Sequence, residues 1–352
     1  MLHNGTPSPS KRIAIDAMGG DLGPAEVIAG LHLALRENAA LNPVTLVGDR
    51  AVLDPIVAAH PFAAARDIKI HHASQVIGMD EKPIAALKQK KDASMVRAIE
   101  LVKNNLAGAV LSSGNTGALM ACGTLRLRTL PGVDRPALAA IVPRENGVFI
   151  ILDVGASPDA EPANLVHNAI LGAHYARDIL GEASPRVALL TIGAEEGKGT
   201  KLTVAAHEIL KNAAAANLLN YTGQMEGFEL FRDHADIVLC DGFTGNVLIK
   251  SWESLARFFT GTLKGELKAN PLRLAGALLG SGAFKAIKRR TNPERYNGAP
   301  LLGLRGNVLK SHGSSNRQAI KHAILAANRF IETDFLHHIE TDIARVNALM
   351  SA

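Results

Sequence analysis

Between residues 12 and 310, short runs of apolar residues alternate with longer segments in which apolar side chains recur every three or four positions. The short runs are typical of β-strands, and several contain no polar residue, as expected of parallel strands buried on both faces. The expected strands are RIAID, VTLVGD, IKIHHA, GAVLSSG, VFIILDVG, RVALLTIG, NLLNYTG, DIVLCDG and GNVLKSHG. The longer segments predict helices over residues 24–38, 93–105, 116–128, 160–180, 200–215 and 244–268, and one long final helix over residues 316–350.

This alternation predicts an α/β fold with a doubly wound, mostly parallel sheet and helices on both faces. We expect residues 1–11 to form a flexible tail and residues 12–352 to form a single catalytic unit with two lobes around a cleft. After Asn270, glycines and a crowded basic end interrupt the alternation. Residues 251–290 are therefore interpreted as an inserted, basic helical segment.

The amino-acid composition limits the classes of protein to which the chain can belong. At 352 residues, with 47% apolar and only 4% aromatic residues, the chain suits helices packed on a sheet better than a stacking platform for nucleic-acid bases. Its two cysteines, Cys122 and Cys240, lack a metal-binding spacing and indicate a reducing compartment. The sequence has neither an apolar run of about 18 residues nor the apolar region of a secretory signal. We expect a cytoplasmic protein that can attach peripherally to a membrane.

The positive charge is concentrated in one segment. The whole chain has a formal net charge of +5, whereas residues 251–290 hold eight lysines and arginines against two acidic residues. Apolar and basic side chains there recur at helical spacing, which fits contact with an anionic membrane or an acidic protein. The alternative is an amphipathic core or dimer helix with a solvated face. The candidate contact residues are Leu255, Phe258, Phe259, Arg257, Lys264, Lys288, Arg289 and Arg290.

Small and polar residues follow most of the expected strands. The turns are DAMGGDLG, VGD, SSGNTGA, DVGASPD, TIGAEEGKGT, DGFTGN and SHGSS. In open parallel sheets, ligands bind beyond the carboxyl ends of the strands, where helix N-termini present unpaired N–H donors. Any one of these turns could use glycine only for tight geometry. Together they predict a broad cleft that favours anions.

The stretch TIGAEEGKGT resembles a nucleotide phosphate loop but departs from its spacing. Gly193 and Gly197 enclose three residues where the phosphate loop needs four, and Gly199 follows Lys198 where Ser or Thr should stand. The stretch still pairs glycine backbone with a cation beside an expected helix start. It is therefore a candidate site for an anion smaller than a nucleotide.

A set of eight motifs resembles one enzyme family. DAMGGD, KKDAS, SSGNTGA, DVGA, IGAEEGKG, DGFTGN, NGAPLLGL and KSHGSS come in the order and spacing of the phosphate acyltransferases of bacterial phospholipid synthesis, the PlsX family. The resemblance extends from about residue 13 to residue 326. Ser157 and Asn297 depart from the usual family residues after DVGA and at the start of GGAPLLGL.

The resemblance implies an activity, a fold and partners. Inorganic phosphate would attack the thioester of a fatty acyl group on acyl carrier protein, releasing acyl phosphate and the free carrier thiol, with no cofactor or metal. The implied fold is similar to phosphotransacetylases and to isocitrate and isopropylmalate dehydrogenases. The implied assembly is a homodimer that passes acyl phosphate to a membrane-bound glycerol-3-phosphate acyltransferase.

That chemistry needs few acid–base groups, because a thiol with a pKa near 8.5 leaves as a thiolate. Its main demands are to orient a phosphate dianion and to stabilise a tetrahedral oxyanion. The catalytic candidates are His312, Asp241, Asn246 and Asn115. The substrate or phosphate candidates are Lys198, Lys90, Lys91, Ser94, Gly114, Thr116, Gly193, Gly197, Asp16, Gly19, Gly20, Asp21 and Ser311. The alternatives are helix caps, solvated lysines and a structural histidine.

Two other functions compete with this interpretation. A phosphotransacetylase acting on acyl coenzyme A shares phosphate and thioester but needs an adenine pocket. A nucleic-acid-binding protein would use the basic segment, which offers only Trp252, Phe258 and Phe259 for stacking and carries no RNA or DNA fingerprint. We therefore expect no nucleic-acid partner.

Overall fold

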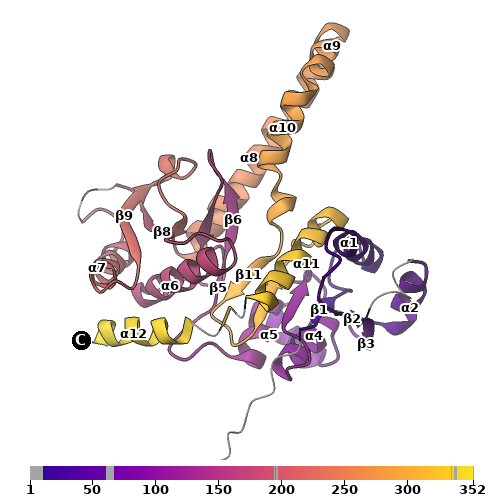
Figure 1. Ribbon diagram of the computed structural model, residues 1–352, viewed down its shortest axis with the longest axis horizontal. Coiled ribbons are helices and arrows are strands. Elements are labelled where there is room, and N and C mark those ends of the chain that lie inside the picture. Colours follow the sequence, from indigo (N-terminus) through magenta and orange to yellow (C-terminus); the bar gives the residue numbers. More distant parts are fainter. Residues whose placement is uncertain are drawn as a thin grey trace, which may run out of the picture.

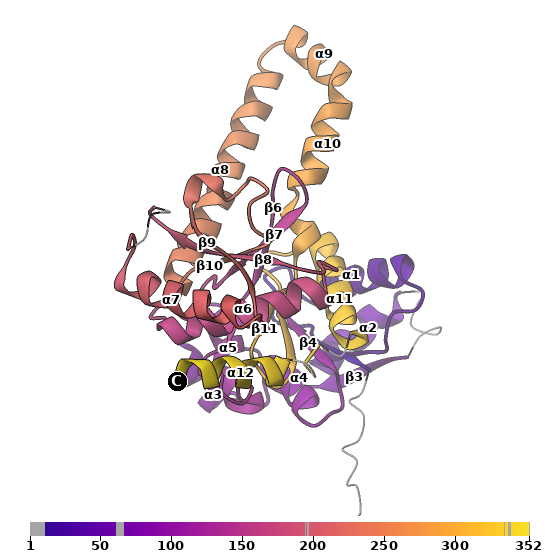
Figure 2. The same ribbon diagram turned by 60° about the vertical axis from the view of Figure 1, so that its left-hand side comes forward.

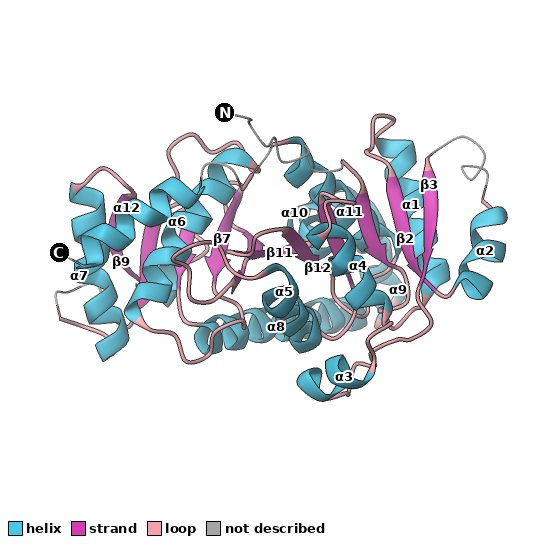
Figure 3. Ribbon diagram, turned by 90° about the horizontal axis from the view of Figure 1, so that it is seen from below, coloured by secondary structure: helices cyan, strands magenta, loops and turns pink. Residues whose placement is uncertain are grey.

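A computed structural model describes residues 11–60, 67–193, 195, 197–333, 335–336 and 339–351. The expected tail of residues 1–11 thus lies outside the described residues except for Lys11. The strands form two sheets that lie side by side, with helices on both faces (Figures 1 and 3). The expected α/β class, with mostly parallel strands, is confirmed, and the strands are divided between two sheets.

The first sheet has seven strands in the order β3-β2-β1-β4-β12-β11-β5. The first five run parallel, whereas β11 is antiparallel to both of its neighbours. The bounds are β1 Ile13–Asp16, β2 Val44–Gly48, β3 Ile68–His72, β4 Ala109–Ser112, β5 Ala137–Leu138, β11 Ala299–Leu302 and β12 Asn307–Lys310. The carboxyl ends of β1, β4 and β12 therefore lie together at one edge.

The second sheet has five strands in the order β6-β7-β10-β8-β9. Its bounds are β6 Ala140–Pro143, β7 Val148–Leu152, β8 Arg186–Thr191, β9 Asn220–Glu226 and β10 Ile237–Leu239. All pairs except β6–β7 are parallel. Only Ala139 separates β5 from β6, so the chain passes from one sheet to the other at this residue.

Helices cover both faces of each sheet. The bounds are α1 Pro24–Glu37, α2 Arg50–Ala58, α3 Pro83–Gln89, α4 Ser94–Lys103, α5 Thr116–Leu127, α6 Pro162–Asp178, α7 Lys201–Ala215, α8 Gly242–Lys268, α9 Pro271–Leu279, α10 Ser281–Thr291, α11 Arg317–Glu332 and α12 Ile339–Ser351, with short 3₁₀ turns η1 Gly227–Glu229 and η2 Pro293–Tyr296. One apolar cluster runs continuously beneath α1, α11, α6 and α7 across both sheets. A second cluster lies under α4 and α5.

The expected basic segment forms most of a long helical arm. The second half of α8, with α9 and α10, projects away from both sheets (Figures 1 and 2). Among the described helices, none is both long and apolar enough to cross a membrane. Large apolar side chains on the arm are nevertheless exposed, reaching 91% at Leu279 near its tip.

The long final helix predicted over residues 316–350 is wrong, because α11 ends at Glu332 and α12 begins at Ile339. Phe335 explains the interruption. Phe335 is buried between the last residue of α11 and the first residue of α12, and its ring packs edge-on against those of Phe330 and Tyr175. The apolar pattern continues through this break, so periodicity alone could not reveal that the chain turns to bury Phe335.

Two histidines of α6 hold the C-terminal helix. His174 Nε2 lies 3.1 Å from Asp342 Oδ2, while Arg177 Nη2 donates to His174 Nδ1 at 2.6 Å. One heptad earlier, His167 Nε2 lies 2.7 Å from Asn347 Oδ1. Burial and the nearby Arg177 lower the pKa of His174 below its ordinary value, against the opposing effect of Asp342 and Asp178.

We predict that acidification lowers the stability of the fold, because a protonated His174 would be buried beside Arg177. Because the folded protein favours neutral His174, its contribution is complete above pH 6.5 and is lost as the pH falls from 6.5 toward the lowered folded pKa. Each unit of pKa difference corresponds to about 1.4 kcal/mol of unfolding free energy. Urea unfolding between pH 7.5 and 5 should show a steeper loss in the wild type than in His174→Gln. Equal slopes would exclude His174 as the titrating group.

Candidate functional site

The last residues of three neighbouring strands form a polar row. Asp16 of β1, Ser112 of β4 and Lys310 of β12 are in register across the first sheet. Residues in register on parallel strands point to the same face. The preceding row on that face is apolar and packs under α4 and α5, and consists of Ala14, Val110 and Val308. The sheet thus carries a buried polar row where its strands end.

Asp16 is enclosed by hydrogen-bond donors. Its Oδ2 accepts from Ser112 Oγ at 2.6 Å, and its Oδ1 accepts from the Met18 N–H at 3.3 Å. The hydroxyl of Ser94, the first residue of α4, also donates to it. Burial raises the pKa of Asp16 above its usual range, against the lowering effect of these donors and of Lys310. The carboxyl group therefore ties together β1, β4 and α4.

Lys310 is the residue at this edge that the sequence reasoning missed. Its side chain is buried, with only 8% of the residue exposed, and its ammonium donates to the carbonyl of Ser311. Burial lowers the pKa of Lys310 to about 8, although Asp16 and Asp21 act in the opposite direction. The available signal was a lysine that ends a buried apolar strand, VLK, directly before a polar turn.

The turns that follow β1, β4 and β12 are packed against one another. A Cβ atom on Gly19 would lie 2.5 Å from Asp16 Oδ2 and 2.8 Å from the backbone nitrogen of Gly114. The Asp21 N–H donates to the carbonyl of Gly313 at 2.9 Å. Only glycine at position 19 allows this approach, so the structure brings together turns that are far apart in the sequence.

Two catalytic candidates at this edge have local partners. Asn115 caps α5 by accepting the Ala118 N–H at 3.0 Å, and its amide donates to the carbonyl of Met79 at 2.7 Å. His312 is exposed, and its Nδ1 lies 2.8 Å from Ser314 Oγ. The side chain of Asn115 therefore organises the turn, whereas Nε2 of His312 makes no hydrogen bond to another described residue.

The remaining candidates of the first edge differ in their surroundings. Ser311 is buried, and its Oγ accepts from Asn297 Nδ2 at 2.6 Å and donates to Ser315 Oγ at 2.9 Å. Lys90 donates to the carbonyl of Val76 at 2.8 Å and pairs with Glu81, whereas the neighbouring Lys91 is exposed. Lys90 thus fastens the loop before α3 and is already paired.

A second group lies at the carboxyl edge of the second sheet. Asp153 is buried, and its carboxylate accepts four backbone N–H groups at 2.5–3.2 Å, from residues 138, 155, 156 and 157. Burial raises its pKa against these donors. Asp241 caps α8 by accepting the Thr244 N–H at 2.8 Å. A Cβ on Gly155 would lie 3.3 Å from Asn246 Nδ2, so Asn246 borders the turn that Asp153 organises.

The lysine-bearing turn follows β8 at the same edge. Lys198 is exposed, and its backbone carbonyl accepts from Thr191 Oγ1 at 3.4 Å and from Gln224 Nε2 at 3.3 Å. Gly193 is packed against the aliphatic part of the Lys198 side chain, and Gly197 has a positive φ of 80°. Since β8 pairs with β10, this turn is adjacent to the Asp241–Asn246 turn.

The predicted site residues thus fall into two groups and an arm, apart from Lys90 and Lys91, which lie between α3 and α4. The first-sheet group contains Asp16, Gly19, Gly20, Asp21, Ser94, Gly114, Asn115, Thr116, Ser311 and His312. The second-sheet group contains Gly193, Gly197, Lys198, Asp241 and Asn246. Val154, after β7, packs against the apolar clusters beneath both groups. The predicted contact residues of the basic segment lie on α8 and α10, with the side chain of Lys288 outside the described residues.

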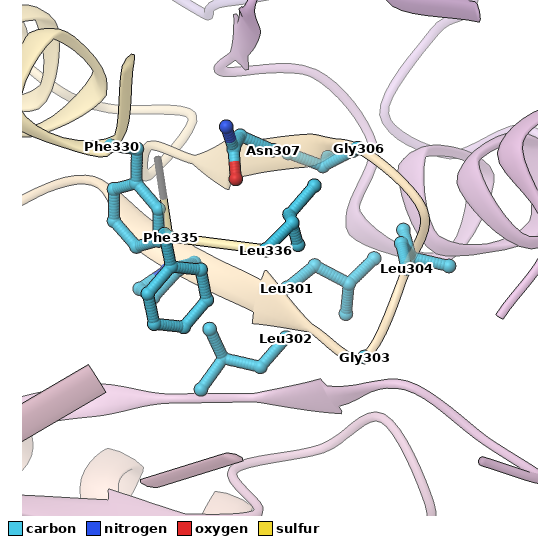
Figure 4. A pocket seen from close by; sticks show the side chains of 11 residues that line it. Leu301, Leu302, Gly303, Leu304, Gly306, Asn307, Phe330, Phe335 and Leu336 are labelled. Carbon is cyan, nitrogen blue, oxygen red and sulfur yellow. The ribbon is translucent and has the colours of Figure 1, made fainter. Parts of the chain in front are cut away.

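An apolar cavity lies away from these turns. It holds about 10 Å³, comparable with one water molecule. Figure 4 shows Phe330, Phe335 and Leu336 facing the hairpin between β11 and β12, at the end of β12 opposite Lys310. It is too small for an acyl chain. Within the described ranges, no group of three or more His, Cys, Asp or Glu side chains could hold a metal ion.

Comparison with known proteins settles the family. The model of the family described as "Fatty acid synthesis protein" matches residues 11–338. The chain belongs to this family. It is 41% identical over 341 residues to the "Phosphate acyltransferase" of Thermoanaerobacterium thermosaccharolyticum, covering 97% of this chain and 99% of the relative. It is also 41% identical over 345 residues to the "Phosphate acyltransferase" of Caulobacter vibrioides, covering 98% and 95%. The resemblance inferred from the eight motifs is confirmed, and with it membership of an enzyme family.

Solved structures confirm the fold. A phosphotransacetylase from Streptococcus pyogenes aligns with a TM-score of 0.62 at 18% identity, covering 92% of this chain and 94% of its own. A branched-chain phosphotransacylase from Enterococcus faecalis aligns with a TM-score of 0.57 at 18% identity, covering 92% and 99%. A putative 4-hydroxythreonine-4-phosphate dehydrogenase from Salmonella typhimurium aligns with a TM-score of 0.51 at 14% identity, covering 91% and 100%. The expected relation to phosphotransacetylase and dehydrogenase folds is therefore correct.

Proposed function

We propose that this protein transfers a fatty acyl group from acyl carrier protein to inorganic phosphate, as a step in phospholipid synthesis. A phosphate oxygen forms a bond to the thioester carbon, the carbon–sulfur bond breaks, and the proton of hydrogen phosphate passes to the departing thiolate. The observation that carries the proposal is the match, over nearly the whole chain, to relatives named phosphate acyltransferase. The proposed product, acyl phosphate, serves a membrane-bound glycerol-3-phosphate acyltransferase.

The carboxyl edges of the two sheets supply what this reaction requires. At the first edge, α4, α5 and α11 begin close to the turns of β1, β4 and β12, so the positive ends of helix dipoles favour a dianion there. At the second edge, Lys198 is exposed and can pair with a phosphate oxygen. His312 and Asn246 are the proposed donors to the oxyanion or the departing sulfur, and Asp241 caps the start of α8, which carries Asn246.

Exposed apolar side chains beside Lys198 offer a surface for the acyl chain. Phe243, Ile192 and Phe228 follow β10, β8 and β9, which are adjacent parallel strands, and they are 65%, 79% and 65% exposed. The register places all three within a few residues of the same sheet edge. Large apolar groups on turns next to a polar site are costly in water unless a ligand covers them. This surface favours a fatty acyl donor over a short-chain one.

The arm is the proposed membrane contact. Leu272 and Leu278 at its tip are exposed, and so are Phe258 and Phe259 on α8. The basic residues Arg257 and Lys264 lie on α8 close in sequence to Phe258 and Phe259. An apolar surface bordered by positive charge fits the anionic boundary of a membrane. The acidic carrier protein and a second copy of the chain, in a homodimer, are the other proposed partners.

The donor assay tests the proposal directly. Purified protein is incubated with phosphate and either palmitoyl acyl carrier protein or palmitoyl coenzyme A, and acyl phosphate is trapped with hydroxylamine. We expect acyl phosphate and free carrier thiol in equal amounts from the carrier protein. Activity with coenzyme A alone would favour the alternative, a phosphotransacetylase. No product from either donor would reject acyl transfer to phosphate.

Replacement of Lys198 tests its contact with phosphate. A charge-assisted hydrogen bond contributes about 1.5–3 kcal/mol, so Lys198→Ala should raise the KM for phosphate about 10- to 100-fold. The KM for the acyl donor should change much less, which initial rates with each substrate varied in turn will show. Lys201→Ala is the matched control, because Lys201 is an exposed lysine three residues later. A phosphate KM that is unchanged in Lys198→Ala would reject this role.

Charge reversal tests the arm. Each basic residue near an anionic membrane contributes about 1 kcal/mol, so Arg257→Glu with Lys264→Glu should weaken binding to phosphatidylglycerol vesicles more than tenfold at low salt. Sedimentation with vesicles measures this, and added salt should shrink the difference. Arg36→Glu with Lys103→Glu makes the same charge change on exposed residues of α1 and α4. Equal losses in both variants would show that binding follows net charge, not the arm.

A further inference from the structure

Burial of the polar row Asp16, Ser112 and Lys310 at the end of the first sheet is not explained by stability of the fold. Lys310 and Asp16 stand at the ends of the row with Ser112 between them, and all three are buried. Burying opposite charges loses hydration that their attraction only partly restores, and apolar residues of similar volume are often as stable. The preceding row of the same strands is apolar. Stability alone therefore does not account for a lysine at position 310.

The surroundings of Lys310 connect three turns of the proposed phosphate site. The acidic groups whose charges raise the pKa of Lys310 are Asp16, at the end of β1, and Asp21, in the turn that leads to α1. Asp21 is itself fixed to the turn after β12, because its N–H donates to the carbonyl of Gly313. Asp16 is fixed to β4 and α4 by the hydroxyls of Ser112 and Ser94. Lys310 is thus the buried cation of a row in which the Asp16 carboxyl group joins β1 to β4, while the Asp21 backbone joins the turns after β1 and β12.

We propose that Lys310 is a positioning residue for the phosphate site: by attracting Asp16 and Asp21 from below the sheet edge, it keeps the turns after β1, β4 and β12 in the arrangement that binds the dianion. The inference rests on the proposed function. Lys310 acts through the two carboxylates, since its own ammonium is buried and donates to the carbonyl of Ser311. Its charge also offsets theirs, which would otherwise repel a doubly negative ligand.

Kinetics of Lys310→Met test this role. Methionine has a similar length without charge, so the turns should remain folded while their alignment is lost. We expect the KM for phosphate to rise at least tenfold and the KM for palmitoyl acyl carrier protein to change less than twofold. The matched control is Lys321→Met, which removes a lysine paired with Glu37 on the outer helices α11 and α1. Its phosphate KM should equal that of the wild type.

The pH dependence supplies a readout that a packing defect would not change. The wild-type phosphate KM should rise as the pH passes about 8, where buried Lys310 loses its proton. Lys310→Arg keeps its charge over this range, so it should retain a low phosphate KM and lack that rise. If Lys310→Met does not fold, this comparison of wild type with Lys310→Arg still tests whether the charge of Lys310 positions the phosphate site.

The outcomes separate this inference from the proposed function. Wild-type acyl phosphate formation with an unchanged phosphate KM in Lys310→Met would overturn the role of Lys310 and leave the reaction intact. A parallel alkaline rise in the wild type and Lys310→Arg would also overturn it. An inactive wild type would instead reject the reaction.

Discussion

Register across β1, β4 and β12 is the constraint on which the first edge depends. Because these strands are parallel and neighbouring, Asp16, Ser112 and Lys310 share one level and one face of the sheet. A slip of one residue in β12 would turn Lys310 to the opposite, apolar face. The turns that follow inherit this alignment, since Gly19 and Gly114 approach each other within van der Waals distance. The polar edge is therefore built by the same pairing that builds the core.

The fold was predictable where local pattern and tertiary environment agree. Uninterrupted apolar runs such as VFIIL become strands buried on both faces, and polar turns follow them at one edge. The apolar pattern did not predict the secondary structure where tertiary packing determines it. The strands flanking Ala139 are too short to stand out, so the passage between two sheets was not anticipated. Phe335 likewise keeps helical spacing in the sequence but interrupts the final helix to reach Tyr175.

The gathering of turns at the first edge was predictable, whereas the buried groups beneath these turns were less so. Turns at the carboxyl ends of parallel strands must gather at an edge, which is why Asp16, Gly19 and Gly114 come together. Lys310 and Asp153 were not predicted as site residues, because their roles depend on burial and on partners that are distant along the chain. Asp153 needs the backbone of Leu138 from another strand, and Lys310 needs the carboxylates of the β1 turn. Neither relation can be read from the local sequence, although the position of Lys310 at the end of the apolar run VLK can.

The two edges differ in a way that fits a reaction between unlike substrates. The first edge buries Asp16 and Lys310 but leaves Asp21 exposed, and hydroxyl and backbone donors surround Asp16. The second edge leaves Phe243 and Ile192 exposed beside Lys198, which suits the proposed contacts of an acyl chain with the apolar side chains and of phosphate with the lysine. Hydration of phosphate is favourable, whereas contact between water and a fatty chain is unfavourable. Under the proposed function, separate sheets keep the exposed apolar side chains apart from the buried polar row until both substrates bind.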